Sequence, residues 1–470
     1  MTEPSGRARD GVGVAQPLLA AVVLTALNAL KPLHVDDTAF FYVARQMAHD
    51  PLRPYGFEAF WSDAPVPGNA VLAPAGLPAW WAIGMRALGD EPFLWKLWLL
   101  PLALLLAFAL HDLLRRFARG LEVPLLWGTL LSPVILPGFN LMLDVPALAL
   151  GLGAFALFLR ACDGGGSAVA AIAAGVLLAW AAQTKYSAIL LAPTIAIAAL
   201  VRRTPWRAVA TLATAFLLFV GWETLVAVQH GASHFLLHAS NLHGPETRGA
   251  QLRLVLPLIT LLGGVGSATT LVGMAALEWP TLGVVVVALT WIGALASFAL
   301  VPPDLALFVS RSPFLTRAFG PLHATLAVLG GLALVVWFAS VVRLLPLRPA
   351  ARARGDGAPA RLDDLVVVAW LVLEIIGAVV LSPYAAVRRV LGPVVAATVV
   401  VGRLASRARA GKDRRWLVVA ACALSALVGC ALYWTDLLEA RAIERGVELA
   451  ARRIDELDRR PDRHVWFAGH

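Results

Sequence analysis

The chain has 470 residues, of which 59% are hydrophobic and 15% are charged, and its mean hydropathy is +0.75. These values exclude an ordinary soluble protein and predict an all-α protein that crosses a membrane many times. The net charge of +9 does not indicate a nucleic-acid partner, because the arginines cluster between apolar runs, where positive residues retain loops on the cytoplasmic side. Cys162, Cys422 and Cys430 form no CxxC motif, so neither a disulfide framework nor a zinc cluster is predicted.

The first apolar run, 14–33, is long for a signal-peptide core, and we interpret it as a retained first span. Asp36 and Asp37 follow at the start of a new helix. The spacing predicts an apolar face with Phe40, Val43, Ala44 and Met47 and a polar face with Tyr42, Arg45, Gln46 and His49. Such a helix is expected to lie flat at the membrane surface. The aspartates either cap this helix or supply a general base that faces a lipid-borne substrate.

Further apolar runs recur along the chain, and about 20 helical residues are enough to cross the hydrocarbon core. We predict about thirteen spans, at 14–33, 93–113, 121–139, 143–160, 168–184, 186–201, 207–229, 251–274, 280–301, 319–342, 364–382, 390–403 and 416–435.

The stretch 70–88 is apolar enough to cross the membrane but is broken by Pro74 and Pro78. If it does not cross, four arginine-rich clusters are cytoplasmic, as the positive-inside rule requires. These clusters are Arg115, Arg116 and Arg119; Arg202, Arg203 and Arg207; the run 343–361; and the run 403–415. We therefore predict that 70–88 is re-entrant or interfacial, and that 34–92 forms one long external loop with interfacial helices.

The predicted domains are a transmembrane domain over 1–435 and a short external tail over 436–470. The tail begins with a charged helical stretch, 437–457, and ends with a strand-like segment, 464–470. A lone strand has no partner to pair with. The tail is therefore expected to be a vestigial or truncated soluble domain.

Four further charged residues fall on the side that this topology makes external. Asp144 opens a span and either caps its helix or contributes to a site. Lys185 lies between two spans, where it either snorkels or binds a lipid phosphate. Arg388 and Arg389 run against the positive-inside trend, which indicates an anionic partner such as a phosphate group.

Other ionisable residues are weaker candidates. His230, His234 and His238 recur every four residues, as a metal-binding stripe could, but no nearby carboxylate pair completes a ligand set. We therefore predict no metal site. Glu223 and Glu374 lie inside spans, where they are either functional or protonated and hydrogen-bonded to a neighbouring helix.

Taken in order, these motifs resemble those of the GT-C membrane glycosyltransferases, in particular the protein O-mannosyltransferase and aminoarabinose-transferase group with its bacterial relatives. The resemblance covers most of the first 200 residues and the region 384–395, and it is thin between 230 and 380. The residues that carry it are Asp36-Asp37 with the helix to His49, the Pro-broken segment from Asn69 to Glu91, Asp144, Thr184-Lys185-Tyr186, and Arg388-Arg389 before Leu391-Gly392-Pro393. One departure is Asn69-Ala70-Val71, where relatives usually have Asn-Pro-Pro.

The resemblance implies transfer of a sugar, with inversion, from a polyprenyl-phosphate donor to a glycan, lipid or protein acceptor. The reaction would take place on the external face of a bacterial-type inner membrane. By position, Asp36 would be the base or acceptor-orienting group, Asp37 would take the place where relatives often have glutamate, and Asp144 would be the second acid. Lys185 and Arg388 or Arg389 would neutralise the donor phosphate. No cofactor is predicted, although a divalent cation is left open.

The main alternative is a transporter or flippase for a lipid-linked or anionic substrate. A transporter should place its charged residues near the middle of the bilayer and reach both sides of the membrane. The charged residues of this sequence are predicted to gather at one surface.

Overall fold

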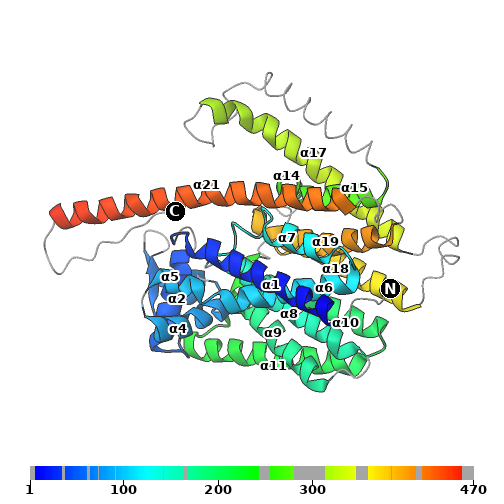
Figure 1. The fold of residues 1–470 in the computed structure, drawn as a ribbon. Helices are drawn as coiled ribbons and strands as arrows, with labels where there is room; N and C mark the ends of the chain where they lie inside the picture. Colours follow the sequence, from blue (N-terminus) through cyan, green and yellow to red (C-terminus); the bar gives the residue numbers. More distant parts are fainter. Residues whose placement is uncertain are drawn as a thin grey trace.

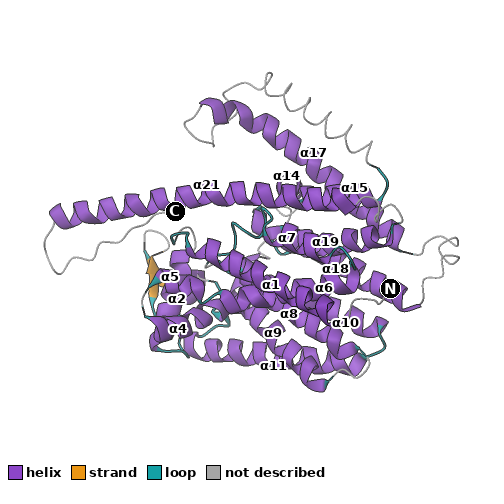
Figure 2. Ribbon diagram, viewed as in Figure 1, coloured by secondary structure: helices purple, strands orange, loops and turns teal. Residues whose placement is uncertain are grey.

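The computed structural model describes residues 6–33, 37–60, 64–71, 73–89, 91–140, 142–163, 167–242, 254–279, 313–345, 358–382, 384–408 and 415–457. Over these residues it is an all-α, multi-pass membrane protein in which long helices lie side by side (Figures 1 and 2). Asp36, the predicted span 280–301 and the strand-like segment 464–470 lie outside the described residues.

The elements of the amino-terminal half are α1 (Gly6–Ala29), α2 (Asp37–His49), β1 (Glu58–Phe60), β2 (Pro65–Pro67), α3 (Gly68–Val71), α4 (Gly76–Leu88), α5 (Pro92–Leu97), α6 (Leu100–Phe117), α7 (Glu122–Leu130), α8 (Asp144–Cys162), α9 (Ala168–Thr184), the 3₁₀ turn η1 (Tyr186–Leu190) and α10 (Leu191–Val201). Those of the carboxyl-terminal half are α11 (Pro205–His230), α12 (His234–Leu242), α14 (Val255–Val265), α15 (Ser267–Ala276), α17 (Pro313–Leu344), α18 (Ala358–Val380), the 3₁₀ turn η4 (Val387–Arg389), α19 (Leu391–Arg407) and α21 (Arg415–Leu457). Strands β1 and β2 form a small antiparallel hairpin with Ala59 opposite Val66.

Helix α8 is the centre of the bundle, with 78% of its most apolar window buried. It packs against α6 and α9, and α9 in turn packs against α11. Small residues allow this close approach, since Gly151 and Gly153 face leucine side chains of neighbouring helices. The interior of the bundle is therefore held mainly by apolar helix contacts.

Five of the described helices are long and apolar enough to cross a membrane, or six if one bent pair counts as a span. The described residues therefore do not confirm the predicted count of about thirteen. The predicted span 251–274 corresponds to α14 and α15, which meet at an angle of 75° and are together apolar and long enough to form a broken span or a re-entrant loop. The break lies at Gly266, whose carbonyl oxygen accepts hydrogen bonds from the hydroxyls of Thr269 and Thr270.

The predicted helical stretch 437–457 is present, but it is no separate element. Helix α21 continues without a break from Arg415 to Leu457 and extends beyond the rest of the bundle (Figure 1). The polar sequence after 435 is rich in Ala, Glu, Leu and Arg, which are strong helix formers, so nothing in it ends the helix.

The arginine clusters meet at one end of the bundle. Arg116 and Arg202 pair with Asp163, Arg202 also pairs with Asp363, and Arg403 and Arg407 pair with Asp364. This network joins the ends of α6, α8, α10 and α19 to the start of α18 and confirms that three of the four predicted clusters share one end.

Helices α2, α4 and α5 cover the opposite end (Figure 1). The buried face of α2 contains Phe40, Val43, Ala44 and Met47, as the sequence predicts. Helix α4 has 13 residues and is about 20 Å long at the usual rise of 1.5 Å per residue. It is therefore shorter than the roughly 30 Å of a hydrocarbon core. It packs against α2, and the Arg86 guanidinium donates a hydrogen bond to the Ala48 carbonyl oxygen. That 70–88 does not cross the membrane stays a prediction.

Candidate functional site

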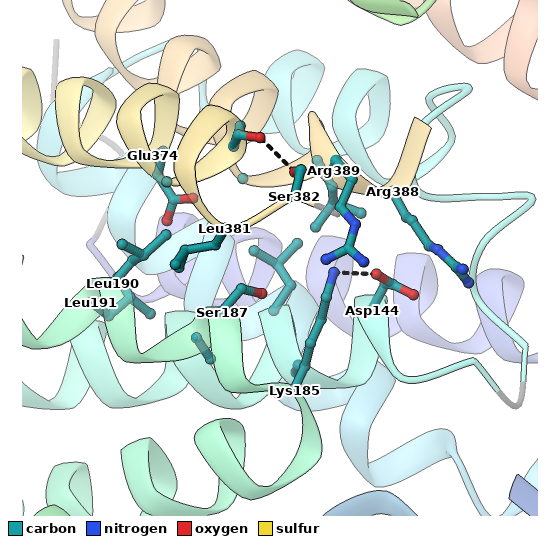
Figure 3. A pocket seen from close by; sticks show the side chains of 17 residues that line it. Asp144, Lys185, Ser187, Leu190, Leu191, Glu374, Leu381, Ser382, Arg388 and Arg389 are labelled. Atoms are coloured by element: carbon teal, nitrogen blue, oxygen red, sulfur yellow. Dashed lines mark hydrogen bonds and ion pairs between the residues drawn. The ribbon is translucent and has the colours of Figure 1, made fainter. Parts of the chain in front are cut away.

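A pocket opens at this second end, among the starts of α8 and α19, the end of α18 and the turn between α9 and α10. Its charged lining consists of Asp144, Lys185, Glu374, Arg388 and Arg389 (Figure 3). The cavity measures about 80 Å³. A water molecule needs roughly 10–15 Å³ on this scale, so there is room for about five to eight waters, or a phosphate group with part of a sugar ring.

Asp144 and Lys185 form an ion pair at the mouth of the pocket. Asp144 is the first residue of α8, where its charge favours the positive end of the helix dipole, and it is 7% exposed. Lys185 is the extended residue between α9 and η1, and its backbone N–H is bonded to the Ala181 carbonyl oxygen. Burial lowers the pKa of the Lys185 amine, whereas the Asp144 carboxylate raises it and the Arg389 guanidinium lowers it.

Arg388 and Arg389 reach the pocket from η4, which links α18 to α19. Their guanidinium carbons lie 5.5 and 5.1 Å from the centre of the Tyr384 ring, and Arg388 donates a hydrogen bond to the Tyr384 hydroxyl. Tyr384 therefore holds both arginines by cation–π contact. Within the described residues Arg389 has no ion pair, and its buried Nε atom has no hydrogen-bond partner.

The pocket mouth therefore carries an excess of positive charge. Lys185, Arg388 and Arg389 supply three cations, and Asp144 is the carboxylate that faces them. A buried guanidinium nitrogen that lacks a hydrogen-bond partner, such as Arg389 Nε, is costly unless a ligand supplies an acceptor. This arrangement suits an anion with several oxygens, such as a phosphate group.

Most of the remaining pocket lining is apolar and leads away from the charged mouth. Leu190, Leu191 and Leu381 line it, and Glu374 lies on the far side (Figure 3). The Glu374 carboxylate accepts a hydrogen bond of 3.2 Å from the Trp370 indole N–H. A head group with an apolar tail would match this combination of a cationic mouth and a leucine-lined wall.

Of the predicted site residues, the structure brings Asp144, Lys185, Arg388 and Arg389 together. Asp37, the first residue of α2, is fully buried and is not part of the pocket lining. It lies instead in a second charged group, where it interacts electrostatically with Lys96.

This second group belongs to the same end of the bundle as the pocket. Lys96 Nζ donates a hydrogen bond of 3.0 Å to the Pro32 carbonyl oxygen. Lys31 Nζ donates one of 2.8 Å to the Pro137 carbonyl oxygen and pairs with Asp436 at 2.5 Å. The segment that follows α1 therefore contacts, through Lys31, the segment that precedes Asp144.

Sequence reasoning singled out Glu374 without placing it in the pocket, and it missed Tyr384 and Ser187. Tyr384 had a usable signal, because it stands four residues before Arg388, in the link between two spans. No group of three or more His, Cys, Asp or Glu residues that could hold a metal ion occurs within the described part of the chain.

No protein-family model and no curated protein matches this chain. Among solved structures, the chain is similar to ArnT from Cupriavidus metallidurans bound to undecaprenyl phosphate, with a TM-score of 0.38, 17% identity, and coverage of 90% of this chain and 78% of that one. It is also similar to the oligosaccharyltransferase AglB from Archaeoglobus fulgidus in complex with an inhibitory peptide and a dolichol-phosphate, with a TM-score of 0.49, 13% identity, and coverage of 92% and 56%. At these scores the likeness assigns neither a family nor an activity to the chain.

Proposed function

We propose that this protein is a membrane glycosyltransferase of the GT-C type, which transfers a sugar from a polyprenyl-phosphate donor to an acceptor. The observation that carries the proposal is the pocket, in which Lys185, Arg388 and Arg389 gather opposite Asp144 beside a wall of leucines. The sequence resemblance supports the same activity, since these four residues match positions of its motifs.

Lys185 and the two arginines bind the phosphate of the donor. A phosphodiester donor carries one negative charge, and the lipid monophosphate that leaves carries nearly two. Cations in a water-poor site therefore stabilise the transition state more than the bound donor, which is the condition for a faster chemical step. Asp144 holds Lys185 in place through their ion pair.

The acceptor hydroxyl attacks the anomeric carbon from the face opposite the phosphate, so the configuration inverts. The new bond joins the acceptor oxygen to the anomeric carbon, and the bond from that carbon to the phosphate oxygen breaks. Its electron pair stays on the lipid phosphate. The acceptor proton passes to a carboxylate, a role that the resemblance gives to Asp36, with Asp37 next to it.

The reaction takes place at the external, periplasmic face of a bacterial-type inner membrane. This orientation is supported by the arginine network at the other end of the bundle, because arginine-rich ends favour the cytoplasmic side. The acceptor is a glycan, a lipid or a protein. The gathering of the pocket cations at one end favours a transferase over a transporter, whose charged residues should lie near mid-membrane.

The test is to incubate the purified protein with a panel of radiolabelled polyprenyl-phosphate sugars and membrane extract. We expect one donor to release free lipid phosphate only when an acceptor is added, with the label recovered on the acceptor. Accumulation of intact donor on the opposite side of sealed vesicles, without release of lipid phosphate, would instead identify a flippase.

A further inference from the structure

Glu223 and His234, which the proposed mechanism does not use, belong to one buried hydrogen-bond network beside the pocket. Glu223 lies in α11 and is 7% exposed. Its Oε1 atom accepts hydrogen bonds from Gln183 Nε2 at 3.0 Å and from the Tyr186 hydroxyl at 3.1 Å. Its Oε2 atom accepts from the Ser233 hydroxyl at 2.7 Å and from the Phe235 backbone N–H at 2.9 Å.

These four donors saturate an ionised carboxylate. Phe235 is the second residue of α12, so the carboxylate also lies at the positive end of that helix dipole. Glu223 forms no ion pair within the described ranges. Its charge is therefore balanced by directed hydrogen bonds, and these fix the positions of the groups that donate them.

Two of the four donors flank Lys185. Gln183 lies two residues before Lys185 near the end of α9, and Tyr186 directly follows it as the first residue of η1. The carboxylate therefore bonds to both sides of the turn from which Lys185 extends to Asp144. Gly76 of α4 packs against the same turn, because a Cβ atom there would lie 2.5 Å from the Gln183 carbonyl carbon.

The network extends from Tyr186 to a stack of aromatic rings. The Tyr186 hydroxyl, which is bonded to Glu223, also forms a hydrogen bond of 2.5 Å with His234 Nδ1. His234 lies between the rings of Tyr55 and His238, at centroid distances of 4.9 and 4.1 Å. This stack holds the His234 ring, and the hydrogen bond between His234 and Tyr186 links the stack to Glu223.

We propose that Glu223 is a positioning residue, which holds Lys185 at the pocket by fixing Gln183 and Tyr186 on either side of it. The proposal rests on the proposed function for its consequence, the binding of a lipid phosphate. The hydrogen bonds by which Glu223 holds Gln183 and Tyr186 are independent of that function. Glu223 is not part of the pocket lining, so it acts on donor binding through the turn that carries Lys185.

The test is a double-mutant cycle in the full-length protein, with undecaprenyl phosphate in detergent as the probe. We expect Glu223→Gln to raise the Kd of the probe about tenfold, within the range that coupled neighbours show. In a Lys185→Met background, Glu223→Gln should cause no further change. Independent, multiplying losses in the double variant would overturn the proposal, because they would show that Glu223 acts through general packing.

Thr211→Val is the matched control. Thr211 is fully buried in α11 and donates a 2.8 Å hydrogen bond to the Ala171 carbonyl oxygen, so it joins the same two helices far from Lys185. Its loss should lower thermal stability and leave the Kd unchanged. Tyr186→Phe removes one of the four hydrogen bonds and should give a smaller rise in Kd than Glu223→Gln. If Glu223→Gln fails to fold, the Kd of Tyr186→Phe tests the proposal in its place.

A second readout does not depend on the proposed function. The Lys185 amine is buried and paired with Asp144, so we expect slow acylation by an amine-reactive reagent, followed by mass spectrometry. Glu223→Gln should accelerate acylation of Lys185, and Thr211→Val should not. If the wild type fails to bind the probe, the proposed function fails. The positioning role of Glu223 is then tested by the acylation rate of Lys185 alone. An unchanged acylation rate in Glu223→Gln would overturn it.

Discussion

The two ends of the helix bundle use charge in opposite ways. At the arginine-network end, Arg116, Arg202, Arg403 and Arg407 each contact an aspartate, so their charge is balanced within the protein. At the pocket end, three cations share the pocket lining with two carboxylates, Asp144 and Glu374, so the cations are in excess. Arginines that are balanced by acids serve to join helices, whereas an excess of cations in a cavity requires an anion from outside.

This difference predicts that arginine substitutions at the two ends have different consequences, and the largest is expected at the pocket. Arg389 is expected to interact more strongly with the leaving phosphate in the transition state than with the phosphate of the bound donor. Its replacement removes this interaction. Arg389→Gln should reduce kcat about 100-fold, as loss of a transition-state donor does, with a smaller change in KM. Steady-state kinetics with the active donor measure this.

The control for that variant is Arg160→Gln, which removes one arginine charge at the other end. Equal losses of kcat in both variants would contradict the contrast between the ends.

The second largest effect is expected on stability at the arginine-network end. Arg403 and Asp364 are 5% and 2% exposed and form a buried ion pair. Asp364→Asn leaves Arg403 without its full counter-charge, which should cost about 3–5 kcal/mol of stability. Thermal unfolding in detergent should show a clearly lowered Tm, while kcat of the folded fraction stays near the wild-type value. A normal Tm would mean that this pair does not hold α18 and α19 together.

An intermediate effect is expected for Asp144→Asn, which should change the pH dependence of donor binding. Burial lowers the pKa of Lys185 and Asp144 raises it, so removal of Asp144 lowers that pKa further. Lys185 binds phosphate only when protonated, so donor binding is lost as pH rises through its pKa. The alkaline limit of donor binding should therefore move to lower pH in Asp144→Asn, as measured by Kd across a pH series. A shift to higher pH would contradict the ion pair.

The smallest effect is expected for the exposed pair Arg160–Asp112, which is also the control above. The Arg160 side chain is 60% exposed and bonds to Asp112 at 2.8 Å. Surface ion pairs contribute about 0–1 kcal/mol. Arg160→Gln should therefore change Tm by little, and a large drop would show that the arginine network depends on its periphery as well as on its buried members.

Much of the pocket end was predictable from the sequence. Apolar runs and the positive-inside rule placed Asp144, Lys185, Arg388 and Arg389 on one side, and helical spacing gave the buried face of α2. The same rule grouped three arginine clusters at the other end. These features depend on local composition and on the order of spans, which a sequence records directly.

Contacts between distant segments were less predictable. Hydropathy measures composition along the chain, so it could not reveal the bend at Gly266 or the continuation of α21 past 435. It also gave no sign that Asp37 would lie near Lys96 while Asp144 pairs with Lys185. The partners of Glu223 likewise come from two separate segments, 183–186 and 233–235, and the packing of α9 against α11 brings the first of them to Glu223.

The most direct test of the phosphate-binding pocket is photo-crosslinking with a photoreactive polyprenyl-phosphate analogue, followed by mass spectrometric mapping. We predict labels on the peptides that contain Leu190, Leu191 and Leu381, and their loss in Arg389→Gln but not in Arg160→Gln. Labelling confined to the arginine-network end, or labelling of the leucine wall that persists unchanged in Arg389→Gln, would contradict the account.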